Sequence, residues 1–377
     1  MISRQLTNII RQKFNKSKAI IILGPRQTGK TTLLKIFEAE NNKQCLFLDC
    51  DDPIARENLE NANLASLRHL IGKNRLVIID EAQRVKNIGL CLKMITDNFK
   101  HVQLLVSGSS ALELAGEINE PLTGRKWEYL LFPLCWQEIN GHYGNLESLR
   151  QLETRIIFGM YPDVVTNPGE ETEILTQLAG SYMYKDILAM KDVRRPDILE
   201  KLLKALALQI GNEVSYNELA RLVEVDKKTI IRYIDLLEKT FIVFRLSPLS
   251  RNARSEIGTG RKIYFYDNGI RNSIISNYNP LSLRQDTGAL WENFLISERM
   301  KFLQYQRLFC NRYFWRTVRQ QEIDYVEEYG GAFHAFELKW NPKVKVHFPK
   351  TFTDAYPDCT TQVVNRSNFA EFLLPGK

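Results

Sequence analysis

Residues 24–31 read GPRQTGKT and match the pattern G-x-x-x-x-G-K-[ST] of phosphate-binding loops. The apolar run Ala19–Leu23 precedes the loop, and a helical pattern over Thr31–Glu40 follows it. Glycines let backbone N–H groups approach phosphate oxygens closely, and the amino end of a helix adds a favourable dipole. This stretch therefore predicts a strand, a phosphate-binding loop and a helix in an α/β fold.

The residue types of the loop predict how it binds a nucleotide. Lys30 is expected to neutralise the β- and γ-phosphates, while the hydroxyl of Thr31 is expected to bind Mg²⁺. The expected nucleotide-binding residues are Gly24, Pro25, Arg26, Gln27, Thr28, Gly29, Lys30, Thr31, Thr32 and Ser107.

A second acidic motif, LVIIDE at residues 76–81, complements the loop. Asp80 follows an apolar strand pattern and is expected to hold the Mg²⁺ shell, whereas Glu81 is expected to act as the general base on water. In isolation such a pair is more often a strand end with solvated acids. Its occurrence at a workable spacing after a phosphate-binding loop supports the functional interpretation. The Asp-Glu pair favours hydrolysis over transfer to a small acceptor, because a nearby carboxylate suits activation of water.

Two further polar positions are candidates for the same site. Ser107 ends the strand pattern at 103–106 and, with Ser109 and Ser110, is expected where a γ-phosphate sensor would lie. The alternative is a serine-rich turn before a helix. Arg125 is a candidate for stabilising transition-state charge, either in its own site or in that of a neighbouring subunit. Its alternative is an ordinary surface arginine.

Apolar runs alternating with helical patterns organise the first 140 residues. Strands are expected at 19–23, 45–48, 76–79, 103–106 and 126–131, and helices at 31–40, 64–71 and 88–99. This alternation is typical of a doubly wound parallel sheet. The expected domains are a P-loop NTPase at 1–145, a helical linker at 146–200, a winged helix at 201–270 and an α/β domain at 271–377.

The segments GPRQTGKTT, LVIIDEAQ, LLVSGSSALEL and LTGRKWEYLLFPL resemble the AAA-type ATPases of bacteria and archaea that are fused to a C-terminal domain of unknown function. The resemblance continues through FGMYP at 158–162, IYFYD at 263–267 and LWENF at 290–294. It implies ATP and Mg²⁺ as cofactors. It also implies a homo-oligomer, a dimer or a ring, in which a neighbour supplies an arginine.

The middle of the chain is basic. Residues 191–262 hold 15 Lys/Arg and 10 Asp/Glu, which accounts for +5 of the total net charge of +7. Three helical patterns followed by two strand patterns predict a winged helix, with the third helix beginning after Asp226. Its polar face carries Lys228, Arg232, Asp235 and Lys239, and the wing carries Arg251, Arg254, Arg261 and Lys262. These cations favour DNA as a partner; the alternative is a solvated helix face.

The C-terminal hundred residues contain a second acidic constellation. Asp324 and the segment Glu337-Leu-Lys339 are expected to meet across a β-hairpin, where Asp324 and Glu337 could hold Mg²⁺ and Lys339 could orient water. The pattern resembles the PD-(D/E)xK nucleases, and Glu292 is the expected helical acid, with Glu298 as the second choice. The alternatives are cross-strand charge pairs on an edge strand, or a nuclease fold without activity.

The chain of 377 residues shows no apolar run long enough to span a membrane and no secretory h-region near its start. A cytoplasmic protein with six reduced cysteines is expected. The function predicted is an ATP-hydrolysing protein that acts on DNA in repair, recombination or defence, with Mg²⁺-dependent cleavage as an added activity. The alternatives are a nucleotide-driven switch that binds another protein, then a kinase of a small acceptor.

Overall fold

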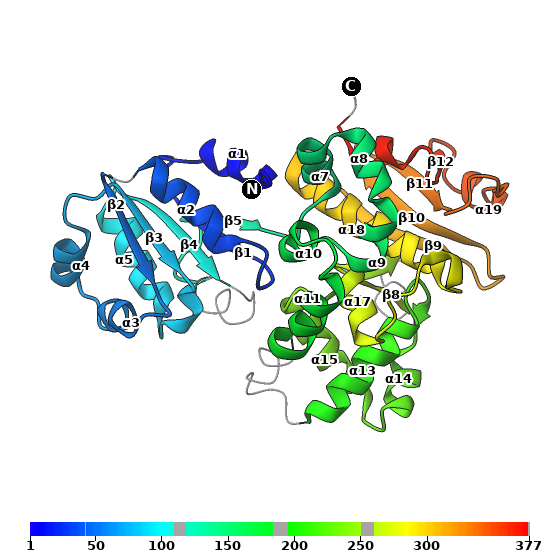
Figure 1. Cartoon of the computed structure of the whole chain (residues 1–377), viewed down its shortest axis with the longest axis horizontal. Coiled ribbons are helices and arrows are strands. Elements are labelled where there is room, and N and C mark those ends of the chain that lie inside the picture. Colours follow the sequence, from blue (N-terminus) through cyan, green and yellow to red (C-terminus); the bar gives the residue numbers. More distant parts are fainter. Residues whose placement is uncertain (42, 109–117, 119, 184–194, 250–259, 376–377) are drawn as a thin grey trace. The chain divides into compact units, whose positions relative to one another are not determined.

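The computed structural model of the chain describes residues 1–41, 43–108, 118, 120–183, 195–249 and 260–375. It divides into two compact units: Met1–Leu134 with Lys239–Phe241, and Cys135–Glu238 with Ile242–Lys377. In Figure 1 residues 1–134 of the first unit run from blue to blue-green, and the second unit runs from green to red. The first unit ends earlier than the boundary expected at 145, because the backbone N–H of Trp136 already donates to the buried Glu298 of the second unit.

The sheet of the first unit has the strand order β2-β3-β4-β1-β5, and all its pairings are parallel. The strands are β1 (Ala19–Leu23), β2 (Cys45–Asp49), β3 (Leu76–Asp80), β4 (Gln103–Gly108) and β5 (Lys126–Leu130). Every residue of β1, β3 and β4 is buried, as the continuous apolar runs predict for strands covered on both faces. The predicted N-terminal parallel sheet is confirmed.

The helices of the first unit include two that the apolar pattern did not predict. They are α1 (Gln5–Arg11), α2 (Lys30–Glu40), α3 (Pro53–Glu60), α4 (Leu64–Ile71) and α5 (Ile88–Asn98), with a 3-10 turn η1 (Ala82–Arg84). The structure adds α1 and α3. The side chain of Asp52 caps α3 by accepting from the N–H of Ile54 at 3.0 Å, and Pro53 occupies its first position.

The sheet of the second unit has seven strands in the order β12-β11-β10-β9-β7-β8-β6. The strands are β6 (Glu213–Val214), β7 (Val243–Pro248), β8 (Arg261–Phe265), β9 (Asn311–Arg316), β10 (Glu322–Tyr329), β11 (Ala332–Leu338) and β12 (Thr360–Val364). β9, β10 and β11 form an antiparallel meander, and β12 joins β11 in parallel. The second unit is therefore also a mixed α/β structure.

The helices of the second unit precede the strands of this sheet, lie between them in the chain and follow the last of them. They are α7 (Trp136–Tyr143), α8 (Asn145–Arg150), α9 (Leu152–Phe158), α10 (Pro162–Thr166), α11 (Glu171–Gln177), α13 (Pro196–Leu208), α14 (Tyr216–Leu222), α15 (Lys227–Lys239), α17 (Asn268–Ile274), α18 (Thr287–Gln306), α19 (Lys350–Thr353) and α20 (Phe369–Leu373). The break between α9 and α10 lies at Gly159, with φ +76°, where an added Cβ would meet Oδ1 of Asp267 at 2.0 Å.

The region expected as a winged helix has the predicted sequence of elements: α13, α14 and α15 precede the antiparallel pair β7–β8. Asp226 caps α15, as predicted, by accepting from the N–H of Thr229 at 2.9 Å. The strand pair differs from a separate wing, however, because β7 also pairs in parallel with β9. The two strands are thus part of the same sheet as the C-terminal strands, across the boundary expected at 270.

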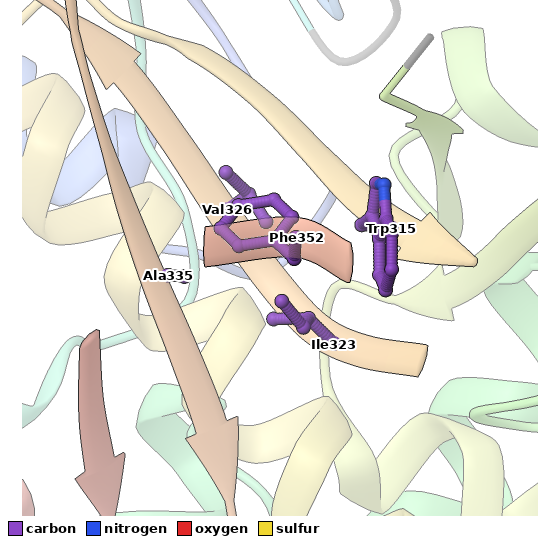
Figure 2. Packing of buried hydrophobic residues seen from close by; sticks show 5 residues of the cluster. All are labelled: Trp315, Ile323, Val326, Ala335 and Phe352. Carbon is purple, nitrogen blue, oxygen red and sulfur yellow. The ribbon is translucent and has the colours of Figure 1, made fainter. Parts of the chain in front are cut away.

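An apolar cluster covers one face of the meander. Figure 2 shows its members: Trp315 of β9, Ile323 and Val326 of β10, Ala335 of β11 and Phe352 of α19. The rings of Trp315 and Phe352 pack edge to face with their centroids 5.2 Å apart. The pairing of β10 with β9 shifts register between Ile323 and Val326, and this irregularity lets two residues three positions apart join one cluster.

Two predictions about composition are tested by the described residues. Across the described ranges, no helix combines the length and hydrophobicity that a membrane span requires. All six cysteines are free thiols, of which Cys50, Cys91 and Cys135 are buried.

Candidate functional site

The phosphate-binding loop joins β1 to α2. Gly29 is the residue before α2 and has the left-handed φ of +89°. Lys30 is 4% exposed, and its Nζ donates to the carbonyl oxygens of Gly24 at 3.0 Å and of Pro25 at 2.8 Å. The hydroxyl of Thr28 also donates to the carbonyl of Pro25, at 2.9 Å. The loop is therefore closed on itself around the lysine ammonium.

The other predicted loop residues line this closed turn. Pro25 and Thr28 are buried, Arg26 is half-buried, and Gln27 is exposed with a left-handed φ of 58°. The adjacent Thr31 and Thr32 are exposed on the first turn of α2. Their hydroxyl groups are therefore accessible at the helix end where a phosphate and its cation would bind.

Gly24 is required by close packing rather than by the turn alone. A Cβ at this position would lie 2.2 Å from the carbonyl oxygen of Leu131, just after β5. The N–H of Leu131 in turn donates to the carbonyl of Leu23 at 2.8 Å. Gly24 therefore packs directly against the backbone of Leu131, and a larger residue would not fit there.

The acidic motif lies at the end of β3, next to the serine at the end of β4. The hydroxyl of Ser107 donates to Oδ1 of Asp80, and both residues are buried. The N–H of Glu81 lies 3.1 Å from Oδ1 of Asp80 and 3.2 Å from Oγ of Ser107. Glu81 has a left-handed φ of 51°, and its Oε2 accepts from the side-chain amide of Gln83. Three predicted residues are thus joined in one hydrogen-bonded group.

The strand order places this group beside the loop. β4 lies between β1 and β3, and the three strands are parallel, so their carboxyl ends lie at one edge of the sheet. With neighbouring strands about 4.8 Å apart, β1 and β3 are separated by roughly 10 Å. The loop that holds Lys30 and the group around Asp80 therefore follow the carboxyl ends of strands that are two positions apart in the same sheet.

Arg125 lies at the amino ends of the strands, whereas the phosphate-binding loop lies at their carboxyl ends. The carbonyl of Arg125 accepts from the N–H of Ala19, the first residue of β1. The phosphate-binding loop begins after Leu23, the last residue of β1. Five residues at about 3.3 Å each separate those ends by roughly 16 Å. Its Nε donates to Oδ1 of Asp97 at 2.7 Å, which is the leading cause of the lowered pKa of Asp97. The expected role in its own site was therefore wrong; the role at a neighbouring subunit stays a prediction.

Two of the serines proposed as sensors, Ser109 and Ser110, lie outside the described residues. Sequence reasoning missed Arg4, whose guanidinium contacts the carbonyl of Thr28 at 2.5 Å. A single arginine in a polar N-terminal segment gives no signal of that contact, since only the tertiary structure brings α1 to the loop.

The C-terminal constellation assembles largely as predicted. Tyr325 pairs with Phe336 in the antiparallel register, so Asp324 and Glu337 are the next cross-strand neighbours. Nζ of Lys339 lies 2.8 Å from Oδ2 of Asp324 and 2.7 Å from Oε2 of Glu337. The N–H of Leu338 also donates to Oδ2 of Asp324 at 2.8 Å. Two carboxylates and one lysine therefore converge.

Glu292 of α18 joins the same cluster through residues of β8. Its Oε1 lies 3.0 Å from Nζ of Lys262 and accepts from the hydroxyl of Tyr264 at 2.5 Å. Lys262 also pairs with Glu322 of β10 at 2.5 Å and is 1% exposed. The expectation that Lys262 contacts DNA phosphates was wrong, because its ammonium is buried among carboxylates. Sequence reasoning missed Tyr264, whose spacing two residues from Lys262 on β8 was the available signal.

The second-choice helical acid, Glu298, has no part in this cluster. Its Oε2 accepts from the N–H of Trp136 at 2.6 Å, and its Oε1 accepts from Lys301 at 2.6 Å. Six residues of helix turn it to a different face from Glu292, so the assignment of Glu298 was wrong.

The electrostatics of the cluster follow from burial and from its central carboxylate. Burial is the main reason that the pKa of Glu292 is raised to about 7, and the charge of Asp324 adds to it while Lys262 opposes it. Burial, then the charge of Asp324, likewise raises the pKa of Glu337 to about 7. Burial alone disfavours the ammonium of Lys339, but its carboxylate partners outweigh burial and raise its pKa. Burial likewise disfavours the ammonium of Lys262, but its carboxylate neighbours outweigh burial and raise its pKa, so Lys262 and Lys339 are both charged at neutral pH.

The nucleotide site of the first unit and the carboxylate cluster of the second unit differ in how well their side chains suit Mg²⁺. Hydroxyl and carboxylate oxygens such as those of Thr31 and Asp80 are the ligand type that Mg²⁺ prefers, and they fit it in the first unit. In the second unit, Asp324 and Glu337 are of the right type but share Lys339 as their counter-ion. Within the part of the chain that the structure describes, no three His, Cys, Asp and Glu side chains form a group that could hold a metal ion.

The basic middle retains part of its predicted surface. Lys228, Arg232 and Lys239 of α15 are exposed. Asp235, in the same stripe, pairs with Arg245 of β7 at 2.7 Å, which reduces its repulsion of a polyanion. Of the predicted wing cations, Arg251 and Arg254 lie outside the described residues.

Comparisons with known families divide the chain in three. Residues 16–140 match a family described as an AAA domain. Residues 149–281 and 287–371 match two domains of unknown function, DUF8612 and DUF4143. The first unit therefore corresponds to the segment that is similar to an AAA domain. The carboxylate cluster combines Lys262 and Tyr264 from the second matched segment with Glu292, Asp324, Glu337 and Lys339 from the third.

Relatives occur in distant prokaryotes. An uncharacterised protein of Mycobacterium bovis is 28% identical over 335 residues, which cover 88% of this chain and 72% of the relative. Uncharacterised proteins of Haemophilus influenzae and Methanocaldococcus jannaschii are 27% and 23% identical, covering 73% and 84% of this chain and 74% and 72% of theirs.

Solved structures give weaker similarities. The Pif1 helicase of Candida albicans is 16% identical, with a TM-score of 0.27, over 48% of each chain. Drosophila ORC bound to DNA is 14% identical, with a TM-score of 0.26, over 67% of this chain and 89% of that one. Similarities of this size support neither a fold nor a function for this chain.

Proposed function

We propose that the protein binds ATP with Mg²⁺ and hydrolyses it. The observation that carries this proposal is the hydrogen-bonded group of Asp80, Glu81 and Ser107 at the same sheet edge as the loop that encloses Lys30. The match of residues 16–140 to an AAA domain supports the same conclusion.

The residues of the chain divide the work of the reaction. Lys30 leaves its loop carbonyls and binds the β- and γ-phosphate oxygens, while the loop N–H groups bind the remaining charge. Thr31 and Asp80 would hold Mg²⁺, which would neutralise charge on the phosphates. Glu81, whose backbone is fixed by its N–H contacts to Asp80 and Ser107, accepts a proton from the attacking water. Ser107 links the γ-phosphate end of the site to Asp80.

We propose DNA as the partner on which this ATPase acts. The exposed cations Lys228, Arg232 and Lys239 on α15 support the proposal, since neutralising phosphates supplies most non-specific affinity. The buried position of Lys262 removes one of the cations first expected there. The exposed cations that remain on α15 suit contacts with the phosphate backbone of DNA.

A second activity is proposed for the C-terminal cluster: Mg²⁺-dependent cleavage of a phosphodiester. It is favoured by the meeting of Asp324, Glu337 and Lys339 within 3 Å contacts, and by the position of Glu292 beside them. Asp324 and Glu337 would bind the cation, and Lys339 would orient water once freed from the carboxylates. The alternative is a cluster that only stabilises the sheet through ion pairs.

The testing experiment measures ATP turnover with single-stranded, duplex and branched DNA, for the wild type and for Lys30→Ala and Asp324→Ala. The proposal expects DNA-stimulated turnover that Lys30→Ala removes. Nicking that requires Mg²⁺ and is lost in Asp324→Ala would support cleavage. ATP turnover that no DNA changes would favour the alternative function, a nucleotide-driven switch that binds another protein.

A further inference from the structure

The first unit contains a buried arginine with no role in the reaction described above. Arg4 directly precedes α1 and is 8% exposed. Its Nη1 donates to the carbonyl of Thr28 at 2.5 Å, and its Nη2 donates to the carbonyl of Phe132 at 2.5 Å. One guanidinium therefore bridges the phosphate-binding loop and the chain that follows β5.

The contact with Thr28 fixes the direction of the next amide. The described peptide bonds are all trans, so the carbonyl of Thr28 and the N–H of Gly29 point in opposite directions. Because that carbonyl faces Arg4, the N–H of Gly29 faces away from Arg4. An N–H at this position, one residue before α2, is among those that bind phosphate oxygens.

We propose that Arg4 is a positioning residue of the nucleotide site: it holds the peptide between Thr28 and Gly29 in the orientation that binds phosphate. This inference rests on the proposed ATP site and extends it to a residue outside the motif. Arg4 acts through the backbone and need not touch the nucleotide.

The second anchor explains why an arginine is needed. Phe132 follows Leu131, whose carbonyl already packs against Gly24 at the start of the loop. The loop is thus held at both ends by residues 131–132: by packing at Gly24 and through Arg4 at Thr28. A planar guanidinium offers two N–H groups in fixed geometry for two carbonyls, whereas a lysine ammonium is a single point of charge on a flexible stem.

The test compares Arg4→Ala and Arg4→Lys with the wild type and with Arg11→Lys. Arg11 is an exposed residue of α1 that pairs with Glu40, so its variant is the matched control. ATP affinity is measured by equilibrium dialysis, and KM and kcat by steady-state hydrolysis. Arg4→Ala is repeated with low millimolar guanidinium ion added, a concentration far below that which unfolds proteins.

The proposal expects Arg4→Ala to raise KM and the ATP Kd roughly tenfold or more, with little change in kcat. The lost interaction stabilises bound ATP and the transition state equally, so only the binding of ATP is weakened. Added guanidinium should lower KM again, and Arg4→Lys should fall between Arg4→Ala and the wild type. A merely structural role would instead lower kcat through loss of folded sites and leave KM unchanged, and that result would overturn the inference. A folded wild type that binds no ATP would overturn the proposed function and this inference together.

Discussion

Nζ of Lys339 lies 2.8 Å from Oδ2 of Asp324, so that the lysine directly after β11 neutralises a carboxylate of β10. The same oxygen accepts from the N–H of Leu338, which fixes the carboxylate in place. Asp324 also faces Glu292 and Glu337, whose pKa values its charge raises. Asp324 is therefore the electrostatic centre of the C-terminal cluster.

Asp324→Asn is expected to lower the pKa of Glu337 from about 7 toward its ordinary value of 4.5. The substitution removes a neighbouring negative charge and leaves Lys339 to pair with Glu337 alone. Burial remains, so the fall should be partial. Carbon-detected NMR titration of labelled glutamates measures the change. An unchanged or higher pKa would show that the two carboxylates do not interact.

The stability of the chain should depend on pH through Glu292. Its pKa is about 7 in the folded protein against an ordinary 4.5, mainly because of burial. A raised pKa means that the stability from its protonated form is complete below about pH 4.5 and is lost as pH rises through 7. At about 1.4 kcal/mol per pKa unit, a shift from 4.5 to about 7 limits the loss to ~3.5 kcal/mol.

Glu292→Gln should remove that pH dependence, because the amide does not titrate. Urea unfolding at pH values between 4.5 and 8 checks the slope, with Glu153→Gln on the exposed side of α9 as control. Parallel curves for Glu292→Gln and the wild type would contradict the assigned pKa shift.

Lys30→Ala is expected to abolish ATP binding, because the phosphate charge loses its buried cation. Lys35→Ala removes an exposed lysine from the same helix and should bind ATP normally. Isothermal titration with ATP and Mg²⁺ compares the two variants. Wild-type affinity in Lys30→Ala would rule out this loop as the nucleotide site.

Glu81→Gln should retain ATP but hydrolyse it roughly 10²–10⁴ times more slowly, the usual contribution of a general base. The glutamine keeps the backbone contacts to Asp80 and Ser107 and loses only the proton acceptor. Phosphate release and ATP binding are measured on the same sample. Hydrolysis at the native rate would assign the base to another residue.

Arg125→Ala should slow turnover without weakening ATP binding if the residue acts in a neighbouring subunit. Asp97→Asn opens the half-exposed ion pair while keeping the arginine, and should change stability by less than about 1 kcal/mol. Mixing Arg125→Ala with Lys30→Ala tests the arrangement directly, since each variant lacks a different part of a shared site. Recovered activity in the mixture is the expected outcome, and full activity of Arg125→Ala alone would refute the role.

The local structure of the first unit could be predicted from its residues alone. The loop at 24–31, its flanking strand and helix and the acidic strand end at Asp80 follow from residue types and short-range periodicity, which a few neighbouring residues fix. The convergence of Asp324, Glu337 and Lys339 was also predictable, because a hairpin and the two-residue repeat of a strand set it.

Contacts between residues that are far apart in the chain could not be predicted and became known from the three-dimensional structure. It placed Arg125 at the far edge of the sheet, buried Lys262 against Glu292, excluded Glu298 from the cluster and brought Arg4 to the loop. Strand order, register and helix packing determine such contacts, and no local pattern encodes them. A charged side chain in the sequence can therefore be read as surface or as buried until its partners are known.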